Sequence, residues 1–284
     1  MKHFVTPIAL ILLLFAACST NKTITQTTKQ DVSMSNEERH LVDSILQFGL
    51  DNEALFTLLG SIKPMSSLVT FYFPVANTDS AKRFSGGVLS RQTHGVYLDR
   101  MRMIQQAINK IDLPDLKFIV VPYLSQQNEQ RIIQISVVRV SLMDSLLNAK
   151  ENFYGQFGLV PGTDPVVVAT AIEGNGDFER WRGYGYMFGY PDYAVNFYNE
   201  ASFKQKQTGE FVERNFFRIP THSRDEGNFV YAYPKDHTPT AAVDSVLYNR
   251  STKVLENYRS IRNNYLNKDS TVQAYKLLQD YYKK

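Results

Sequence analysis

Apolar side chains recur along most of this chain at the spacing of an amphipathic α-helix. Residues 35–38 (Ser-Asn-Glu-Glu) have the order of a capping box, in which a serine and a glutamate satisfy the first free N–H groups of a helix. Behind it, Leu41, Ile45 and Phe48 fall on one face. We therefore expect a helix from this box to Gly49, followed by a second, shorter helix.

The same spacing predicts three helices in the middle of the chain. The first covers residues 96–111, where apolar side chains return every three or four positions. The second begins at Ser141 or Asp144 and continues to about residue 157. The third lies near residues 192–201, after a proline turn. Each of these segments has one apolar face to bury.

A pair of helices is predicted at the C-terminal end. Thr238 and Pro239 have the order of a cap followed by a residue that suits the first helical turn. A last helix is expected over residues 270–282. The first helix of the pair is expected to bury a long apolar stripe made of Val243, Val246, Leu247, Val254, Tyr258, Ile261 and Tyr265.

Five short segments are rich in β-branched and aromatic residues, which favours strands. Residues 68–73 stop at a proline. Residues 117–122 and 131–140 are expected to form an antiparallel hairpin with a loose polar loop, and residues 211–219 and 228–233 form a second pair. The pairing is local, as in antiparallel sheets.

Two segments are harder to interpret. Asp164 and Pro165 favour a helix start, whereas the valines and isoleucine of residues 166–172 prefer a strand. In residues 182–190, aromatic side chains alternate with glycine and methionine. That period of two predicts a strand with aromatics on one face and an almost bare second face.

These elements together predict an α+β fold. Helices dominate, and the strands do not alternate regularly with them as in a parallel doubly wound sheet. We expect a helix-rich single domain over residues 35–284, with a small, mostly antiparallel sheet of about five strands and a long C-terminal helix pair. A chain of this length can bury a sizeable core.

The N-terminal segment has a different character. A short basic start is followed by an apolar run over residues 4–17 and then by Cys18, the only cysteine of the chain. This resembles a bacterial lipoprotein signal peptide, with two alanines before Cys18 as in a lipobox and Phe15 where that pattern prefers leucine. The run is too short to span a bilayer, which needs about 20 apolar residues.

The resemblance implies a lipid anchor. Residues 1–17 are expected to be removed, and Cys18 to be acylated and to hold the protein to the lipid bilayer. Residues 18–34 then form a disordered tether ahead of the globular domain. Because no acidic run follows Cys18, we expect the protein in the cell envelope, on the periplasmic face of the outer membrane.

The charge and composition of the chain indicate which kinds of ligand are expected and which are not. The formal net charge is +3, spread along the chain without a basic block, so nucleic-acid binding is not expected. No cofactor motif is found. His222 and His237 have no diagnostic metal spacing, and no metal site is expected. The chain holds 17 Tyr and 18 Phe against one Trp, which is typical of proteins that line wet grooves or bury many rings.

The favoured hypothesis is a non-enzymatic binding domain. Its partner would be an envelope protein or a glycan, held by an aromatic-lined surface near residues 178–198. The residues expected to contact it are Trp181, Tyr184, Tyr186 and Tyr190.

Two alternatives stay open. Glu173 and Glu179 flank a Gly-Asn-Gly-Asp turn next to Arg182, and paired carboxylates perform acid–base catalysis on glycans. This predicts a periplasmic hydrolase that acts on glycan or peptidoglycan. A spacer between membrane and wall, the other alternative, would need no concave pocket.

One tripeptide, Asp-Ser followed by an apolar residue or threonine, occurs five times. It is similar to the acceptor motif of a general bacterial O-glycosylation system, although Asp and Ser are also preferred at helix starts. The candidate acceptors are Ser44, Ser80, Ser145, Ser245 and Ser270.

Overall fold

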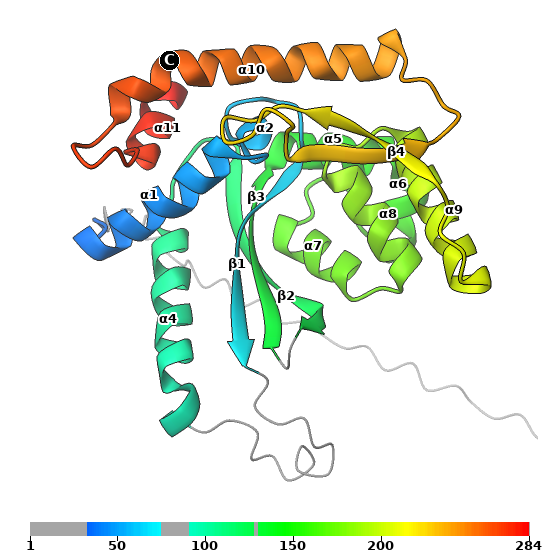
Figure 1. The fold of residues 1–284 in the computed structure, drawn as a ribbon. Helices are drawn as coiled ribbons and strands as arrows, with labels where there is room; N and C mark the ends of the chain where they lie inside the picture. The colour runs from blue at the N-terminus through cyan, green and yellow to red at the C-terminus, as the bar shows by residue number, and fades with distance from the viewer. Residues whose placement is uncertain (1–32, 75–90, 128–129, 284) are drawn as a thin grey trace, which may run out of the picture. The chain divides into compact units, whose positions relative to one another are not determined.

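The computed structural model describes residues 33–74, 91–127 and 130–283, and residues from Ser33 onward form one compact unit. The architecture is α+β, as predicted, with many helices, one three-stranded and one two-stranded antiparallel sheet (Figure 1). The signal peptide, Cys18 and most of the expected tether lie outside the described residues.

The three-stranded sheet forms the centre of the domain. It consists of β1 (Met65–Pro74), β2 (Leu116–Gln127) and β3 (Gln130–Arg139), in the order β1-β3-β2. The antiparallel β2–β3 hairpin confirms the predicted pairing, but the strands are longer than expected, because Gln127 already pairs with Gln130. The expectation of a loose polar loop over residues 125–130 is therefore wrong, since the pairing continues to Gln127 and Gln130.

Helices cover both faces of this sheet, because successive side chains of a strand point to opposite sides. Phe118 and Val137 face a core cluster that includes side chains of α1 (Asn36–Asp51), whereas Ile119 and Val138 face a second cluster. The first cluster also includes side chains of α2 (Leu55–Leu58), α4 (Arg91–Asn109), α10 (Val246–Arg262) and α11 (Ala274–Tyr282). The second cluster includes side chains of α5 (Val140–Ala149), α6 (Glu151–Tyr154), α7 (Pro165–Glu173) and α8 (Asp177–Met187) (Figure 1).

The helix α1 begins as predicted. The Ser35 side chain accepts a hydrogen bond from the Glu38 backbone N–H, and the Glu38 carboxylate accepts one from the Ser35 N–H, which completes the capping box. The helix continues two residues beyond Gly49, to Asp51. No described helix has the length and apolar character needed to cross a bilayer.

The segment with conflicting signals is the helix α7. The Asp164 side chain accepts a hydrogen bond from the Val166 N–H at 2.8 Å, and Pro165 occupies the first turn. Capping thus outweighs the strand preference of the valines, because Val168 and Ile172 are buried against the sheet at helical spacing.

The predicted strand at residues 182–190 is wrong, because residues up to Met187 belong to the helix α8. The alternation reflects helix packing. A Cβ atom on Gly183 would lie 2.6 Å from Ile172 Cγ2 of α7, and one on Gly185 would lie 2.9 Å from Val195 Cγ2 of α9 (Asp192–Thr208). The glycines therefore let α8 approach both neighbouring helices.

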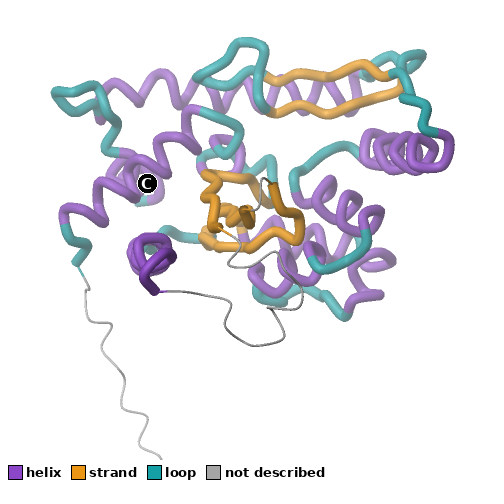
Figure 2. Tube along the Cα trace, turned by 60° about the horizontal axis from the view of Figure 1, so that its bottom comes forward, coloured by secondary structure: helices purple, strands orange, loops and turns teal. Residues whose placement is uncertain are grey.

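The second sheet pairs β4 (Arg214–Ile219) with β5 (Phe229–Pro234), which confirms the second predicted strand pair. Figure 2 shows this ribbon apart from the central sheet. Gly227 has a positive φ of 75°, and a Cβ there would lie 1.9 Å from the Ile219 carbonyl oxygen, so the turn requires glycine.

The C-terminal helix pair is present but differs in detail. The cap is Thr240, whose side chain accepts from the Val243 N–H, so the expected start at Thr238 is wrong. A π-helical turn, η2 (Ala241–Ser245), precedes α10 and leaves Val243 and Val246 exposed, whereas Tyr258 is buried as predicted. The last helix, α11, starts later than expected.

Candidate functional site

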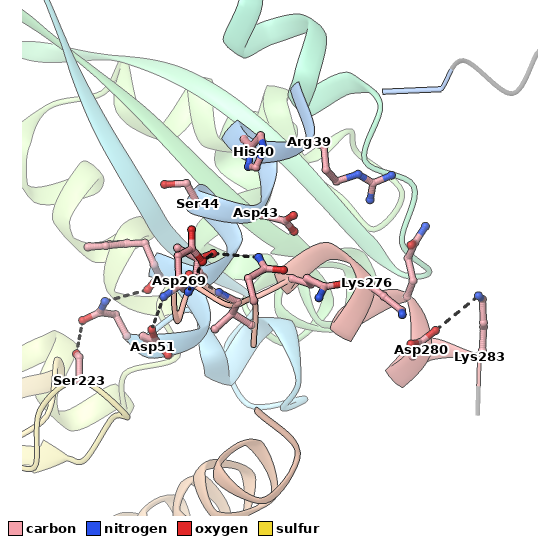
Figure 3. A pocket seen from close by; sticks show the side chains of 18 residues that line it. Arg39, His40, Asp43, Ser44, Asp51, Ser223, Asp269, Lys276, Asp280 and Lys283 are labelled. Atoms are coloured by element: carbon pink, nitrogen blue, oxygen red, sulfur yellow. Dashed lines mark hydrogen bonds and ion pairs between the residues drawn. The ribbon is translucent and has the colours of Figure 1, made fainter. Parts of the chain in front are cut away.

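The described structure contains a cleft of about 950 Å³ that is lined mainly by polar residues. Helix α1 forms one wall, and the segment from Asn267 through α11 forms the other (Figure 3). The residues that line it are Arg39, His40, Asp43, Ser44, Gln47, Phe48, Asp51, Asn52, Ser223, Asn267, Asp269, Thr271, Val272, Gln273, Lys276, Gln279, Asp280 and Lys283.

Side chains of α1 fasten the opposite wall. Asp43 Oδ1 accepts a hydrogen bond of 2.8 Å from the Tyr275 N–H in the first turn of α11, and Gln47 Oε1 accepts one of 2.9 Å from the Val272 N–H. Burial raises the pKa of the Asp43 carboxyl above its usual value, and the helix N–H groups partly oppose that shift. The two walls are thus held at a fixed spacing.

A second set of bonds closes the other end of the cleft. Asp51 Oδ1 accepts from the Tyr258 hydroxyl at 2.7 Å and from Arg262 Nε at 3.0 Å, both on α10. Asn52 Oδ1 accepts from the Ser223 hydroxyl at 2.7 Å. Three separate parts of the chain therefore meet at the C-terminal end of α1.

The cleft carries little net charge. Its lining has three permanent cations and four carboxylates, which gives −1 when histidine is neutral. Asp51 is neutralised by Arg262, and Lys283 lies 3.7 Å from Asp280. Arg39 lies over the Tyr275 ring, 4.8 Å from its centroid. Most other lining groups are hydroxyls and amides.

Trp181, one of the predicted binding residues, lies in an aromatic cluster outside the cleft. Its ring is 5.5 Å from Phe178 and 5.9 Å from Tyr198, in edge-to-face arrangements. The ammonium group of Lys206 lies 5.1 Å from the Trp181 ring and forms an ion pair with Asp177. The cluster joins α8 to α9.

The three predicted tyrosines occupy different places. Tyr184 is partly buried and meets Tyr123 of β2 edge-on at 6.0 Å. Tyr186 is buried in the core, and Tyr190 stacks on Phe229 at 5.9 Å. Tyr186 and Tyr190 also line a shallow hollow of about 300 Å³. The four aromatic residues thus do not share one environment.

The two carboxylates of the hydrolase hypothesis also differ in their surroundings. Glu173 is buried, and its Oε1 atom accepts a 2.7 Å hydrogen bond from the Leu124 N–H. Glu179 is exposed on α8, and Arg182 donates to Asn196 Oδ1 at 2.6 Å. Neither carboxylate lines the cleft or the shallow hollow.

The four aspartates of the Asp-Ser tripeptides that the structure describes have structural partners. Asp144 accepts from the Gly162 N–H at 2.7 Å, and the buried Asp244 accepts from the hydroxyls of Tyr193 and Tyr231. The described serines Ser44, Ser145, Ser245 and Ser270 are exposed, and Ser80 lies outside the described residues.

Sequence reasoning missed the cleft. The apolar face of α1 predicts the helix, but the cleft is lined by its polar face, where Asp43, Gln47 and Asp51 recur every four residues. That spacing was the available signal; the meeting with Ser223 and α11 was not visible in the sequence. No metal-binding group of His, Cys, Asp and Glu occurs in the described residues.

Comparisons of this chain with protein-family models, with curated proteins and with solved structures gave no match. The interpretation of the cleft therefore depends on its geometry alone.

Proposed function

We propose that this protein is an envelope lipoprotein that binds a hydrophilic ligand in the cleft between α1 and α11. The observation that carries the proposal is the cleft itself. It has a volume of about 950 Å³, is lined mainly by polar residues, and is fastened at both ends by hydrogen bonds that Asp43 of α1 and the next residue after that helix, Asn52, accept. Ligand sites in proteins commonly have volumes of about 300–1,000 Å³ and are largely formed before binding. A spacer would need no such cleft.

The anchor is the second part of the proposal. Acylated Cys18 would keep the binding domain at the periplasmic face of the outer membrane, on a short polar tether. A tethered receptor meets envelope components at high local concentration, so even weak affinity is sufficient for function.

Catalysis has less support than binding. The candidate pair Glu173 and Glu179 lies outside the cleft, and Glu173 is occupied by the Leu124 N–H and by Arg180, 3.7 Å away. A glycosidase needs two carboxyls that face one substrate. We therefore favour a binding protein over a hydrolase.

Photo-crosslinking in the native host tests the use of the cleft. A benzophenone amino acid replaces Ser44 inside the cleft or, as the control, Ser145 in the shallow hollow; both serines are exposed on helices. We expect a mass gain after irradiation at position 44 and much less at 145. Equal adducts at the two positions, or none at position 44, would contradict the proposed site.

The anchor is tested separately. Wild-type protein is expected to take up labelled palmitate and to fractionate with membranes, whereas Cys18→Ser is expected to do neither. An unlabelled wild type, or a Cys18→Ser protein that stays with the membranes, would remove the anchor from the account.

A further inference from the structure

Among the described residues that line the cleft, Phe48 is the one Phe, Tyr or Trp. Its side chain is 49 % exposed at the C-terminal end of α1, whereas Val272, the other apolar lining residue, is buried. Asn52 Nδ2 donates to the Phe48 carbonyl oxygen at 2.9 Å, which fixes this turn next to the Ser223 end. A water-exposed ring thus adjoins a wall of hydroxyls and amides.

The charges of the lining disfavour strongly ionic ligands. A phosphate site gathers several donors with positive charge. Here the carboxylates outnumber the permanent cations by one, and the guanidinium of Arg39 is stacked on Tyr275. A polycation would need unpaired carboxylates, yet Asp51 is already bound by Arg262.

We infer that the ligand is a glycan, with the Phe48 ring stacked on the apolar face of one sugar and the polar wall bonded to its hydroxyls. This inference rests on the proposed function of the cleft. A sugar ring has an apolar C–H face and a polar rim, so it needs both features at one site. Gln273 and Gln279 in the lining provide planar amide groups, each of which has a donor and an acceptor for sugar hydroxyls.

The form of the cleft favours several sugar units over one. Ser223 and Lys283 lie at opposite ends of the view in Figure 3, with α1 between them. The volume of about 950 Å³ is near the upper end of common ligand sites. A short oligosaccharide would follow α1 from Phe48 towards Lys276.

The ligand class is tested by equilibrium titration of the full-length protein in detergent. Peptidoglycan of the host is split by an amidase into glycan strands and stem peptides, and delipidated envelope polysaccharide is a third probe. The variants are Phe48→Ala, Phe48→Trp and the control Phe203→Ala. Phe203 is 47 % exposed on α9, so the control removes an equally exposed ring outside the cleft.

We expect at least one of the two sugar probes to bind the wild type and Phe203→Ala with equal affinity. Loss of the ring in Phe48→Ala is expected to weaken binding about tenfold, and Phe48→Trp to retain it. Thermal unfolding confirms that each variant is folded.

Two results overturn the inference. One is binding of the stem peptides alone, with a mass gain at position 44 in the crosslinking experiment; the cleft would then be a binding site for another class of ligand. The other is failure of both sugar probes at millimolar concentration. If no adduct forms at position 44 either, the proposed function fails as well.

Discussion

At the residue scale, Lys63 shows how the fold holds a buried charge. Its side chain is 0 % exposed, its ammonium group lies 2.6 Å from Glu53 Oε2, and it also faces the Phe229 ring at 4.5 Å. Burial lowers the pKa of Lys63, and the Glu53 carboxylate opposes this shift. Glu53 is partly exposed, so water shares its charge. The two partners are therefore not equivalent.

This asymmetry predicts unequal effects of single substitutions. Glu53→Gln leaves a fully buried ammonium without its partner and is expected to lower the free energy of unfolding by about 3 kcal/mol. Lys63→Met leaves the Glu53 carboxylate, which water can solvate, and is expected to lower the free energy of unfolding by only about 1 kcal/mol. Urea unfolding of both variants measures the difference. A larger loss in Lys63→Met would contradict this view of the pair.

His222 gives a pH-dependent contribution to stability. Its ring meets Tyr258 edge-on at 5.5 Å, and burial lowers its pKa below 6.5, assisted by Arg262 and Arg259 and opposed by Asp51. The folded state therefore resists the proton that the unfolded state accepts. The stability that the neutral His222 ring contributes is fully present above the pKa of His222 in the unfolded state. It is lost as the pH falls through the lower pKa of His222 in the folded state.

The corresponding variant is His222→Gln. Between about pH 7.5 and 5.5 the wild type is expected to lose more stability than this variant, as measured by denaturant unfolding at each pH. Equal losses in the two proteins would show that His222 does not contribute to the pH dependence.

At the element scale, close helix packing explains the most misleading part of the sequence. The alternation of aromatics and glycines at residues 182–190 has the period of a strand. The first six of these residues, up to Met187, nevertheless belong to the helix α8. Gly183 and Gly185 are buried where α7 and α9 approach. The hydrophobic period alone cannot distinguish a strand from this helix, since the two glycines are needed for contacts with the helices before and after α8.

Gly183→Ala tests this packing. Alanine favours a helix by about 1 kcal/mol, but its Cβ would overlap the stiff side chain of Ile172, and overpacking commonly costs about 1–3 kcal/mol. We expect a net loss of stability. The matched control is Gly155→Ala, where the nearest atom, Glu151 Cγ, is 3.8 Å away, and no loss is expected. Similar unfolding midpoints for the two variants would contradict the account of α8.

Other elements were predictable because their signals are local. The capping box fixed the start of α1, and β-branched runs revealed both hairpins. Asp164 gave the start of α7, although its valines left that prediction open. The start of α10 was placed too early, because η2 inserts an extra turn that no local pattern indicated.

At the scale of the whole molecule, the cleft is a property of tertiary structure. Its walls come from α1 and α11, and Ser223 between β4 and β5 closes one end. No motif links these segments in the sequence, whereas aromatic residues are concentrated at residues 178–198 and predict a binding surface there. The structure distributes those rings between an α8–α9 cluster and the core.

The central claim is that envelope ligands occupy the cleft, and hydrogen exchange tests it most directly. Full-length protein in detergent is compared with and without a soluble extract of envelope glycans from its host. We predict slower exchange in α1 and in residues 266–276, with α8 and α9 unchanged. Protection confined to α8 and α9, or no protection at all, would contradict the claim.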